Sequence, residues 1–170
     1  MKRLVYLILN TLVATIISCN TIFSDDIRGN DMTLLIDNVA VEVDWENNDS
    51  VKELCEKVKS NAITINANRY GGFEQVGSLG QSIKSNNVQM TTEPGDIVLY
   101  NGSNIVIFFG SNSWSYTKLG KIKNKNLNEL KQLLDKGSVV FTLKSAIGSN
   151  ILSNTNTTAT VNTNKRYGNW

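Results

Sequence analysis

The most regular pattern in the chain is an alternation of apolar and polar residues in short runs. Val39, Val41, Val43 and Trp45 occupy every second position of one run. Successive side chains of a strand point to opposite faces, so these four share one face. Other runs are rich in β-branched and aromatic residues, which favour strands. Together the runs predict strands at residues 33–36, 39–45, 62–66, 96–100, 105–109, 114–119 and 138–143.

Turn residues separate several of these runs. Asp37-Asn38 lies between the first two predicted strands, and Asn101-Gly102 follows a later one. Both patterns predict hairpins. Pro94-Gly95 suits the centre of a type II turn, because Pro fixes φ and Gly accepts a positive φ. Two stretches have no clear period and are predicted to be loops, namely the Gly-punctuated residues 70–80 and the polar residues 81–93.

Two segments repeat their apolar residues at helical spacing. Ser50 and Glu53 fit a capping box at the start of the first, and Asn126 and Glu129 fit one at the start of the second. Gly137 is predicted to end the second helix. The expected buried stripes are Val51, Leu54, Cys55 and Val58 in the first helix and Leu127, Leu130, Leu133 and Leu134 in the second.

Short strands separated by Gly, Asn and Pro-Gly turns predict a mainly β fold. We expect a closed β-barrel with two short helices at its ends. Closing the sheet would remove the unpaired strand edges that favour aggregation. Cys55 is expected to be a small buried apolar residue of this core, because it lies on the apolar stripe of the first helix.

The first 19 residues have the pattern of a secretion signal. Lys2 and Arg3 precede a mostly apolar run at residues 4–17, which is short compared with the about 20 residues that span a bilayer. The run ends in Ser18-Cys19, an ending that resembles the bacterial lipoprotein signal. The resemblance implies cleavage before Cys19 and lipid attachment to its thiol, and two or more acyl chains hold a protein stably on a membrane.

These features divide the chain into four parts. Residues 1–18 are predicted to be a lipoprotein signal peptide, 19–31 a tether, 32–144 the barrel domain and 145–170 a disordered tail rich in Thr and Asn. The predicted location is extracytoplasmic, with the chain lipid-anchored in the cell envelope. The choice between inner and outer membrane is left open. An ordinary signal peptide with an incidental Cys and an uncleaved anchor are the alternatives.

Composition and charge narrow the possible functions. The chain has no His and 2 Cys, which excludes Ser–His or Cys–His catalysis and His-ligated metals. Loss of Lys2 and Arg3 with the signal reduces the 17 basic residues to 15, equal to the 15 acidic residues. A neutral chain lacks the electrostatic footprint of nucleic-acid binding. We expect a monomer with no nucleic-acid partner, no metal and no cofactor.

Four segments of the predicted barrel carry a resemblance to a known family. They read YGGFE at residues 70–74, PGDIVLY at 94–100, IVIFFG at 105–110 and WSYTKLG at 114–120. In order and spacing the chain resembles the small bacterial cyclophilin-like domain family over about residues 32–143. The resemblance implies a closed eight-stranded barrel with two capping helices. It implies a fold more firmly than a function.

Cyclophilins themselves isomerise prolyl bonds with an Arg beside an apolar, aromatic-lined groove. The uncatalysed barrier is about 18–20 kcal/mol, so such an Arg must be held rigidly. Arg69, with Phe73 and Gln75 nearby, is the candidate here, but its spacing departs from the cyclophilin pattern. A solvated Arg at a strand end is the interpretation we favour. We therefore expect no catalytic residue and keep peptidyl-prolyl isomerisation of exported proteins as the alternative function.

The acidic residues of the resembling segments are expected to have structural roles. Glu74 is predicted to accept hydrogen bonds from loop N–H groups, with a general base as the alternative. Asp96 is predicted to support the Pro-Gly turn. The function we expect is a membrane-tethered binding module for a peptide or a small ligand. Its binding rim is predicted where Tyr70, Glu74, Tyr100, Trp114 and Tyr116 converge.

Overall fold

The computed structural model describes residues 31–146. Within this range the chain forms ten strands and two helices. The strands are β1 (Met32–Ile36), β2 (Val39–Val41), β3 (Val43–Trp45), β4 (Ile63–Tyr70), β5 (Glu74–Ser78), β6 (Val88–Thr91), β7 (Asp96–Tyr100), β8 (Asn104–Phe108), β9 (Ser113–Ile122) and β10 (Ser138–Ser145). The helices are α2 (Asp49–Ser60) and α3 (Leu127–Leu134).

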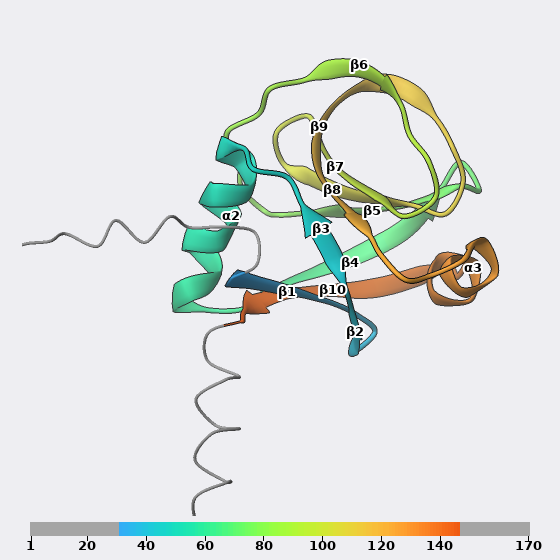
Figure 1. Ribbon diagram of the computed structural model, residues 1–170, viewed down its shortest axis with the longest axis horizontal. Helices are drawn as coiled ribbons and strands as arrows, with labels where there is room; N and C mark the ends of the chain where they lie inside the picture. Colours follow the sequence, from blue (N-terminus) through green and yellow to red (C-terminus); the bar gives the residue numbers. More distant parts are fainter. Residues whose placement is uncertain (1–30, 147–170) are drawn as a thin grey trace, which may run out of the picture.

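The strands form one nearly closed antiparallel barrel (Figure 1). Their order is β2-β1-β10-β4-β5-β8-β7-β9-β3, and β6 pairs with β9 outside this path. β2 and β3 are separated only by Glu42. The first pairs with β1 and the second with β9, so this interrupted segment brings the two ends of the sheet together. The predicted mainly β barrel is confirmed, and eight strands form its ring when β2 and β3 are counted together.

The strands β7 and β8 carry apolar side chains on both of their faces. Alternate residues of β7 and β8, such as Leu99 and Ile107, point into the main core. The residues between them, such as Val98 and Phe108, belong to a second apolar cluster on the outer face. Both strands are therefore almost entirely buried. Their continuous apolar sequence follows from this burial on two sides.

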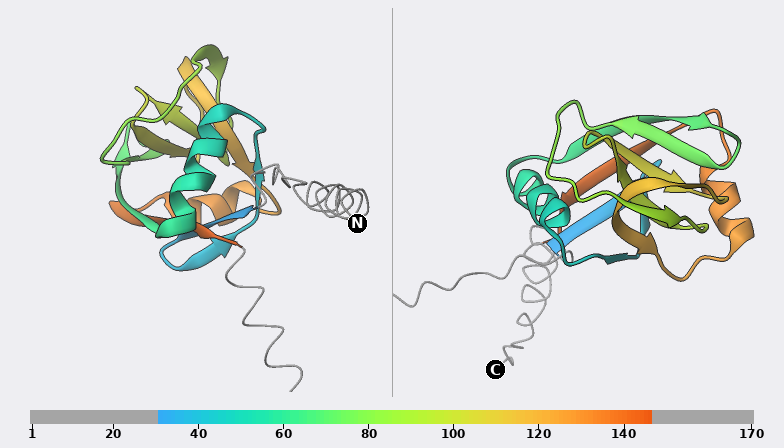
Figure 2. Two further views of the ribbon diagram at one scale, coloured as in Figure 1. Left: turned by 90° about the vertical axis from the view of Figure 1, so that its left-hand side faces the viewer. Right: turned by 90° about the horizontal axis from the view of Figure 1, so that it is seen from above.

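The two helices cover opposite ends of the barrel (Figures 1 and 2). α3 begins with the predicted capping box of Asn126 and Glu129. The predicted capping box at α2 is wrong, because Asn48 is the N-cap and accepts a hydrogen bond from the Val51 N–H at 3.0 Å. Ser50 lies inside the helix, and its Oγ donates to the Lys84 carbonyl at 2.7 Å.

Cys55 lies on the buried face of α2, as predicted. Its exposed fraction is 1%, and it packs in the main core. Burial raises the pKa of its thiol to about 11, so the thiol stays protonated at neutral pH. Cys55 thus acts as an apolar core residue rather than a nucleophile.

The predicted turns form as the sequence indicates. Asn101 and Gly102 both have positive φ, as the type I′ hairpin requires. Gly95 has φ 91°, and the Asp96 N–H donates to the Glu93 carbonyl, which closes the type II turn. Gly137 does not end α3, because the helix stops at Leu134 with Asp135 as its C-cap.

Two strands lie in stretches that the sequence analysis assigned to loops. β5 is a central strand whose inward positions are Gln75 and Gly77, so it lacks an apolar alternation. β6 pairs only with β9 and is mostly exposed, so its sequence needs no apolar face. Neither strand could therefore be recognised from periodicity.

The predicted signal peptide, Cys19 and the Thr/Asn-rich tail lie outside the described residues. No helix within residues 31–146 combines the length and the apolar character needed to cross a membrane.

Closure of the barrel at β3 and β9 can be tested at Gly120. A Cβ there would lie 2.7 Å from the Asp44 carbonyl oxygen and 3.0 Å from Val43 Cγ1. Gly120→Ala should therefore push β3 away and lower the free energy of unfolding by roughly 1–3 kcal/mol in urea titrations. At Gly137 a Cβ would meet no heavy atom within 4 Å, so Gly137→Ala should change it by less than about 0.5 kcal/mol. Equal losses in the two variants would contradict this account.

Candidate ligand-binding pocket

A pocket of about 400 Å³ lies on the outer face of the barrel, next to the second apolar cluster. It brings together all five side chains that were predicted to form a rim, although ligand binding there stays a prediction. Three further residues complete its wall. The full lining is Tyr70, Glu74, Val76, Tyr100, Val106, Asn112, Trp114 and Tyr116.

Strand register places these side chains next to one another. Tyr70 of β4 is paired with Glu74 of β5. Two residues along β5, Val76 is paired with Val106 of β8. Paired residues of neighbouring strands point to the same face, and positions two apart in a strand share that face. The outer face therefore collects the lining from strands that are distant in sequence.

Aromatic rings form much of the surface around the pocket. The rings of Tyr100 and Tyr116 meet edge to face at a centroid distance of 5.9 Å, and those of Phe108 and Tyr116 do so at 5.7 Å. Phe73 stacks on Phe108 at 6.5 Å. Such contacts add to the stability gained from area burial. They hold the Tyr116 ring, which is 4% exposed, in one position.

Two aromatic side chains of the lining are open to solvent. The exposed fraction is 68% for Tyr70 and 56% for Trp114. Large aromatic residues are favourable to bury, and these two belong to different strands at the same pocket. The rim thus offers apolar surface that a bound molecule could cover.

Glu74 is the acidic group of the pocket. The residue is 6% exposed, and its Oε2 atom has no hydrogen-bond partner among the described residues. Burial raises the pKa of the carboxyl to about 7, because desolvation disfavours the charged form. The predicted role of Glu74 in holding loop N–H groups is not supported, since no backbone hydrogen bond contributes to its pKa.

Tyr116 and Asn112 form a polar pair at the pocket wall. The Asn112 Nδ2 group donates to the Tyr116 hydroxyl at 2.9 Å. Burial, together with the negative charge of Glu74, raises the pKa of the Tyr116 phenol. The phenol therefore stays protonated at neutral pH, whereas the pKa of Glu74 lies near neutrality.

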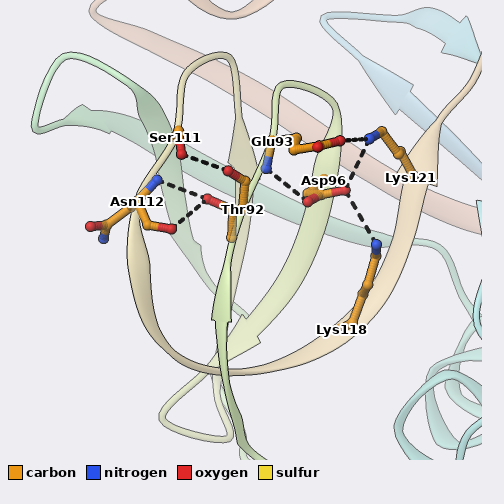
Figure 3. Close-up of polar contacts among 7 residues, drawn as sticks. All are labelled: Thr92, Glu93, Asp96, Ser111, Asn112, Lys118 and Lys121. Atoms are coloured by element: carbon orange, nitrogen blue, oxygen red, sulfur yellow. Dashed lines mark hydrogen bonds and ion pairs between the residues drawn. The ribbon is translucent and has the colours of Figure 1, made fainter.

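A polar network holds the chain on either side of Asn112 (Figure 3). The Thr92 Oγ1 donates to the Asn112 carbonyl at 3.1 Å and accepts from the Asn112 N–H at 3.0 Å. The Ser111 Oγ donates to the Thr92 carbonyl at 2.7 Å. Thr92 is fully buried. These bonds position Asn112 for its contact with Tyr116.

Asp96 supports the Pro-Gly turn, as predicted. Its Oδ2 accepts from the Glu93 N–H at 2.9 Å. Its Oδ1 faces Lys118 and Lys121 at 3.5 and 3.8 Å (Figure 3). These two ammonium groups compensate the charge of the buried carboxylate. Asp96 is thus a structural group outside the pocket, and Glu74 differs from it in having no such cation.

The three residues considered for prolyl isomerisation do not assemble into a site. Arg69 is paired with Gln75, so both lie on the sheet face opposite Glu74. The Arg69 guanidinium forms an ion pair with Asp135 at 3.0 Å and lies over the Phe109 ring. Phe73 instead belongs to the outer cluster. The Arg69 side chain is therefore committed to the α3 end of the barrel.

Three lining residues were not predicted from the sequence, namely Val76, Val106 and Asn112. Val106 could have been found, because it alternates with core residues on a predicted strand. Val76 lies on the unrecognised strand β5. Asn112 lies in a loop whose position depends on Thr92, and no sequence pattern indicates that contact.

A second hollow of about 740 Å³ lies beside the start of α2. Most of its lining residues are polar, and they carry both signs of charge, including Asp49 and Lys84, which approach each other to 3.9 Å. Thr117 there donates to the Asn87 side chain at 2.7 Å. Its polar groups largely bond to one another. No group of three or more metal-ligating side chains occurs within the described part of the chain.

The fold defines a small mainly β domain with two covering helices and a pocket on its outer wall. The sequence model of the cyclophilin-like family matches residues 34–144. The chain belongs to this family. The match accounts for nearly all of the described barrel, from β1 to β10.

Comparison with solved structures finds similarity to a hypothetical protein from Archaeoglobus fulgidus, whose structure was determined in solution. The two are 19% identical, with a TM-score of 0.46, and the match covers 68% of this chain and 93% of the archaeal chain. No curated protein sequence matches the chain.

The buried Glu74 should make stability depend on pH. Its folded-state pKa of about 7 lies above the ordinary value of 4.5 for a Glu carboxyl. Its neutral form is therefore favourable to folding below pH 4.5, and this contribution is lost as the pH rises to about 7. At pH 8 Glu74→Gln should raise the free energy of unfolding by roughly 2 kcal/mol, with little change at pH 4.5. Urea titrations at both values measure this, and an equal effect at both would contradict it.

Proposed function

We propose that the protein is a lipid-anchored, extracytoplasmic binding protein whose cyclophilin-like domain holds a small ligand or a peptide side chain in the outer pocket. The observation that carries the proposal is the meeting of exposed aromatic rings with a buried, unpartnered carboxyl group. Ligand sites typically combine apolar walls with a few polar groups. A group with a perturbed pKa in such a hollow indicates function.

Two energetically unfavourable features at Glu74 support a binding role. A buried polar atom without a partner is unfavourable, by about 1–3 kcal/mol. Exposed aromatic surface at Tyr70 and Trp114 adds a second unfavourable feature at the same place. A ligand that covers the rings and bonds to the carboxyl would relieve both.

The anchor is supported by the sequence and by the arrangement of the barrel. The segment ending in Ser18-Cys19 resembles a lipoprotein signal. The chain enters the barrel at Met32 and leaves it near Ser145, and these two residues are paired. In the strand order, β1 lies across the ring from β8, whose outer face lines the pocket. An anchored domain would therefore direct its pocket away from the side on which the chain enters.

Prolyl isomerisation is not favoured. The reaction needs an Arg held beside the prolyl amide in an apolar groove, and Arg69 is bound to Asp135 on the other face of the sheet. The outer pocket has no Arg or Lys among its described lining residues. Its chemistry is that of an aromatic hollow with one acidic group.

Binding through the aromatic rim can be tested with Trp114→Ala. A thermal-shift screen of short peptides and envelope metabolites identifies ligands, and calorimetry measures their affinities. Because Trp114 is 56% exposed at the pocket, its loss should weaken binding roughly tenfold while stability changes little. Leu127→Ala is the control. Leu127 was predicted to be buried, but the structure leaves it 46% exposed on α3, away from the pocket. Unchanged binding in Trp114→Ala would rule out this pocket.

The lipid anchor can be tested with Cys19→Ala. If Cys19 carries acyl chains, the wild-type protein enters the detergent phase of a Triton X-114 separation and incorporates labelled palmitate in cells. The variant should remain in the aqueous phase and take up no label. Equal partitioning of the two proteins would show that Cys19 does not anchor the chain.

A further inference from the structure

We propose that the ligand of the outer pocket carries a protonated amino group that binds Glu74 while its apolar stem lies against Tyr100, Trp114 and Tyr116. This inference rests on the proposed binding function and names the chemical class of the ligand. The shared chemistry is a primary ammonium group on a short aliphatic chain. A free alkylamine and a lysine side chain of a peptide both present it.

The carboxyl group is the first argument. Glu74 lines the pocket, is 6% exposed and has an oxygen without a hydrogen-bond partner. The terminal torsion of a Glu side chain is soft and nearly two-fold, so either oxygen can be turned towards a ligand. An ionised carboxylate accepts hydrogen bonds only. The group that completes this site when Glu74 is ionised is therefore a hydrogen-bond donor.

The lack of a protein cation is the second argument. The other buried carboxylate of the barrel, Asp96, faces Lys118 and Lys121. The described lining of the outer pocket contains no Lys or Arg, and burial is the only cause of the raised pKa of Glu74. A negative charge in a desolvated site is strongly favoured by a positive partner. The ligand is the remaining source of that charge.

The aromatic wall is the third argument. Faces of aromatic rings attract cations, and such contacts are stronger when the cation is desolvated. The rings of Tyr100 and Tyr116 flank the pocket near Glu74, and Trp114 is open to solvent at its rim. A carboxylate within an aromatic hollow suits an ammonium group better than an anion or a neutral carbonyl.

The groups facing Glu74 determine how binding depends on pH. The titratable neighbours in the described lining are the phenols of Tyr70 on β4, Tyr100 on β7 and Tyr116 on β9, and the β8 residues opposite are apolar. The pKa of Tyr116 is raised above its usual value, and phenols ordinarily titrate near pH 10. With its pKa of about 7, Glu74 changes charge between pH 6 and pH 8.

The test uses the full-length protein and calorimetric titration with n-butylammonium, 1-butanol and tetramethylammonium. With a Glu74 pKa of about 7, the ionised fraction rises about tenfold from pH 6 to pH 8, and the amine stays protonated. The affinity for n-butylammonium should rise about tenfold over this range. At pH 8 it should exceed the affinity for 1-butanol, which lacks the charge, and for tetramethylammonium, which lacks an N–H donor.

The matched variants are Glu74→Gln and Glu56→Gln. The first should remove both the pH dependence and the preference for n-butylammonium over 1-butanol. The second changes an exposed carboxylate of α2 outside the pocket, and it should leave both unchanged. An affinity for the ammonium probe that Glu74→Gln leaves within twofold of wild type would overturn the inference.

The remaining outcomes separate this inference from the proposed function. If 1-butanol binds as tightly as n-butylammonium and Trp114→Ala weakens it, the pocket binds ligands and the ammonium inference is wrong. If no probe binds at millimolar concentration, the ammonium inference also fails, while the wider screen decides on binding itself. Tight binding of Nα-acetyl-lysine N-methylamide but not of n-butylammonium would indicate that the amino group belongs to a lysine of a peptide. The reverse result would indicate a free amine.

Discussion

The antiparallel register across β5, β8 and β7 is the constraint on which the pocket depends. It places Glu74 opposite Phe108, and Val76 opposite Val106. A shift of one residue would exchange every inward side chain for its outward neighbour. Since both faces of β7 and β8 are apolar, hydrophobicity alone discriminates weakly between the two registers of these strands. The hairpin at Asn101 and Gly102, whose positive φ angles define the turn, therefore matters for the register of β7 and β8.

The adjacent residues Glu74 and Gln75 show how the two faces differ. Gln75 points inward and is fully buried, and its Nε2 donates to the carbonyls of Leu134 and Lys136 at 2.7 Å each. These bonds fix the end of α3 against the barrel. Glu74 points outward and is nearly as buried. One oxygen of each side chain, Glu74 Oε2 and Gln75 Oε1, has no hydrogen-bond partner among the described residues, but of the two only Glu74 can carry a charge. Gln75 thus holds α3 against the barrel, whereas burial of the Glu74 carboxyl disfavours its charged form and raises its pKa to about 7. Residues of the second kind are expected where a binding site requires them.

The sequence was sufficient for the fold class and for bringing together five of the eight residues that line the pocket. Alternation located the strands with one apolar face, and the dipeptides Asn101-Gly102 and Pro94-Gly95 located their turns. The convergence of Tyr70 and Trp114 could be predicted through the family resemblance, whereas periodicity alone does not specify it. β5 was missed because its inward side chains are an amide and a Gly that packs against Ile65. The cap of α2 was misplaced because Asn48 also donates to the Lys118 carbonyl at 2.8 Å, a tertiary contact that local sequence does not encode.

The same register also explains why the pocket can vary without loss of the barrel. Inward residues of β7 and β8 pack with β1, β4 and β10 in the main core, so their replacement affects the whole domain. Outward residues contact mainly one another and β6, which pairs only with β9. Changes at Tyr100, Val106 or Trp114 would therefore alter the pocket without creating cavities in the main core. Membership of the cyclophilin-like family thus accounts for the barrel, whereas the proposed ligand would be selected by Glu74 and the rings around it.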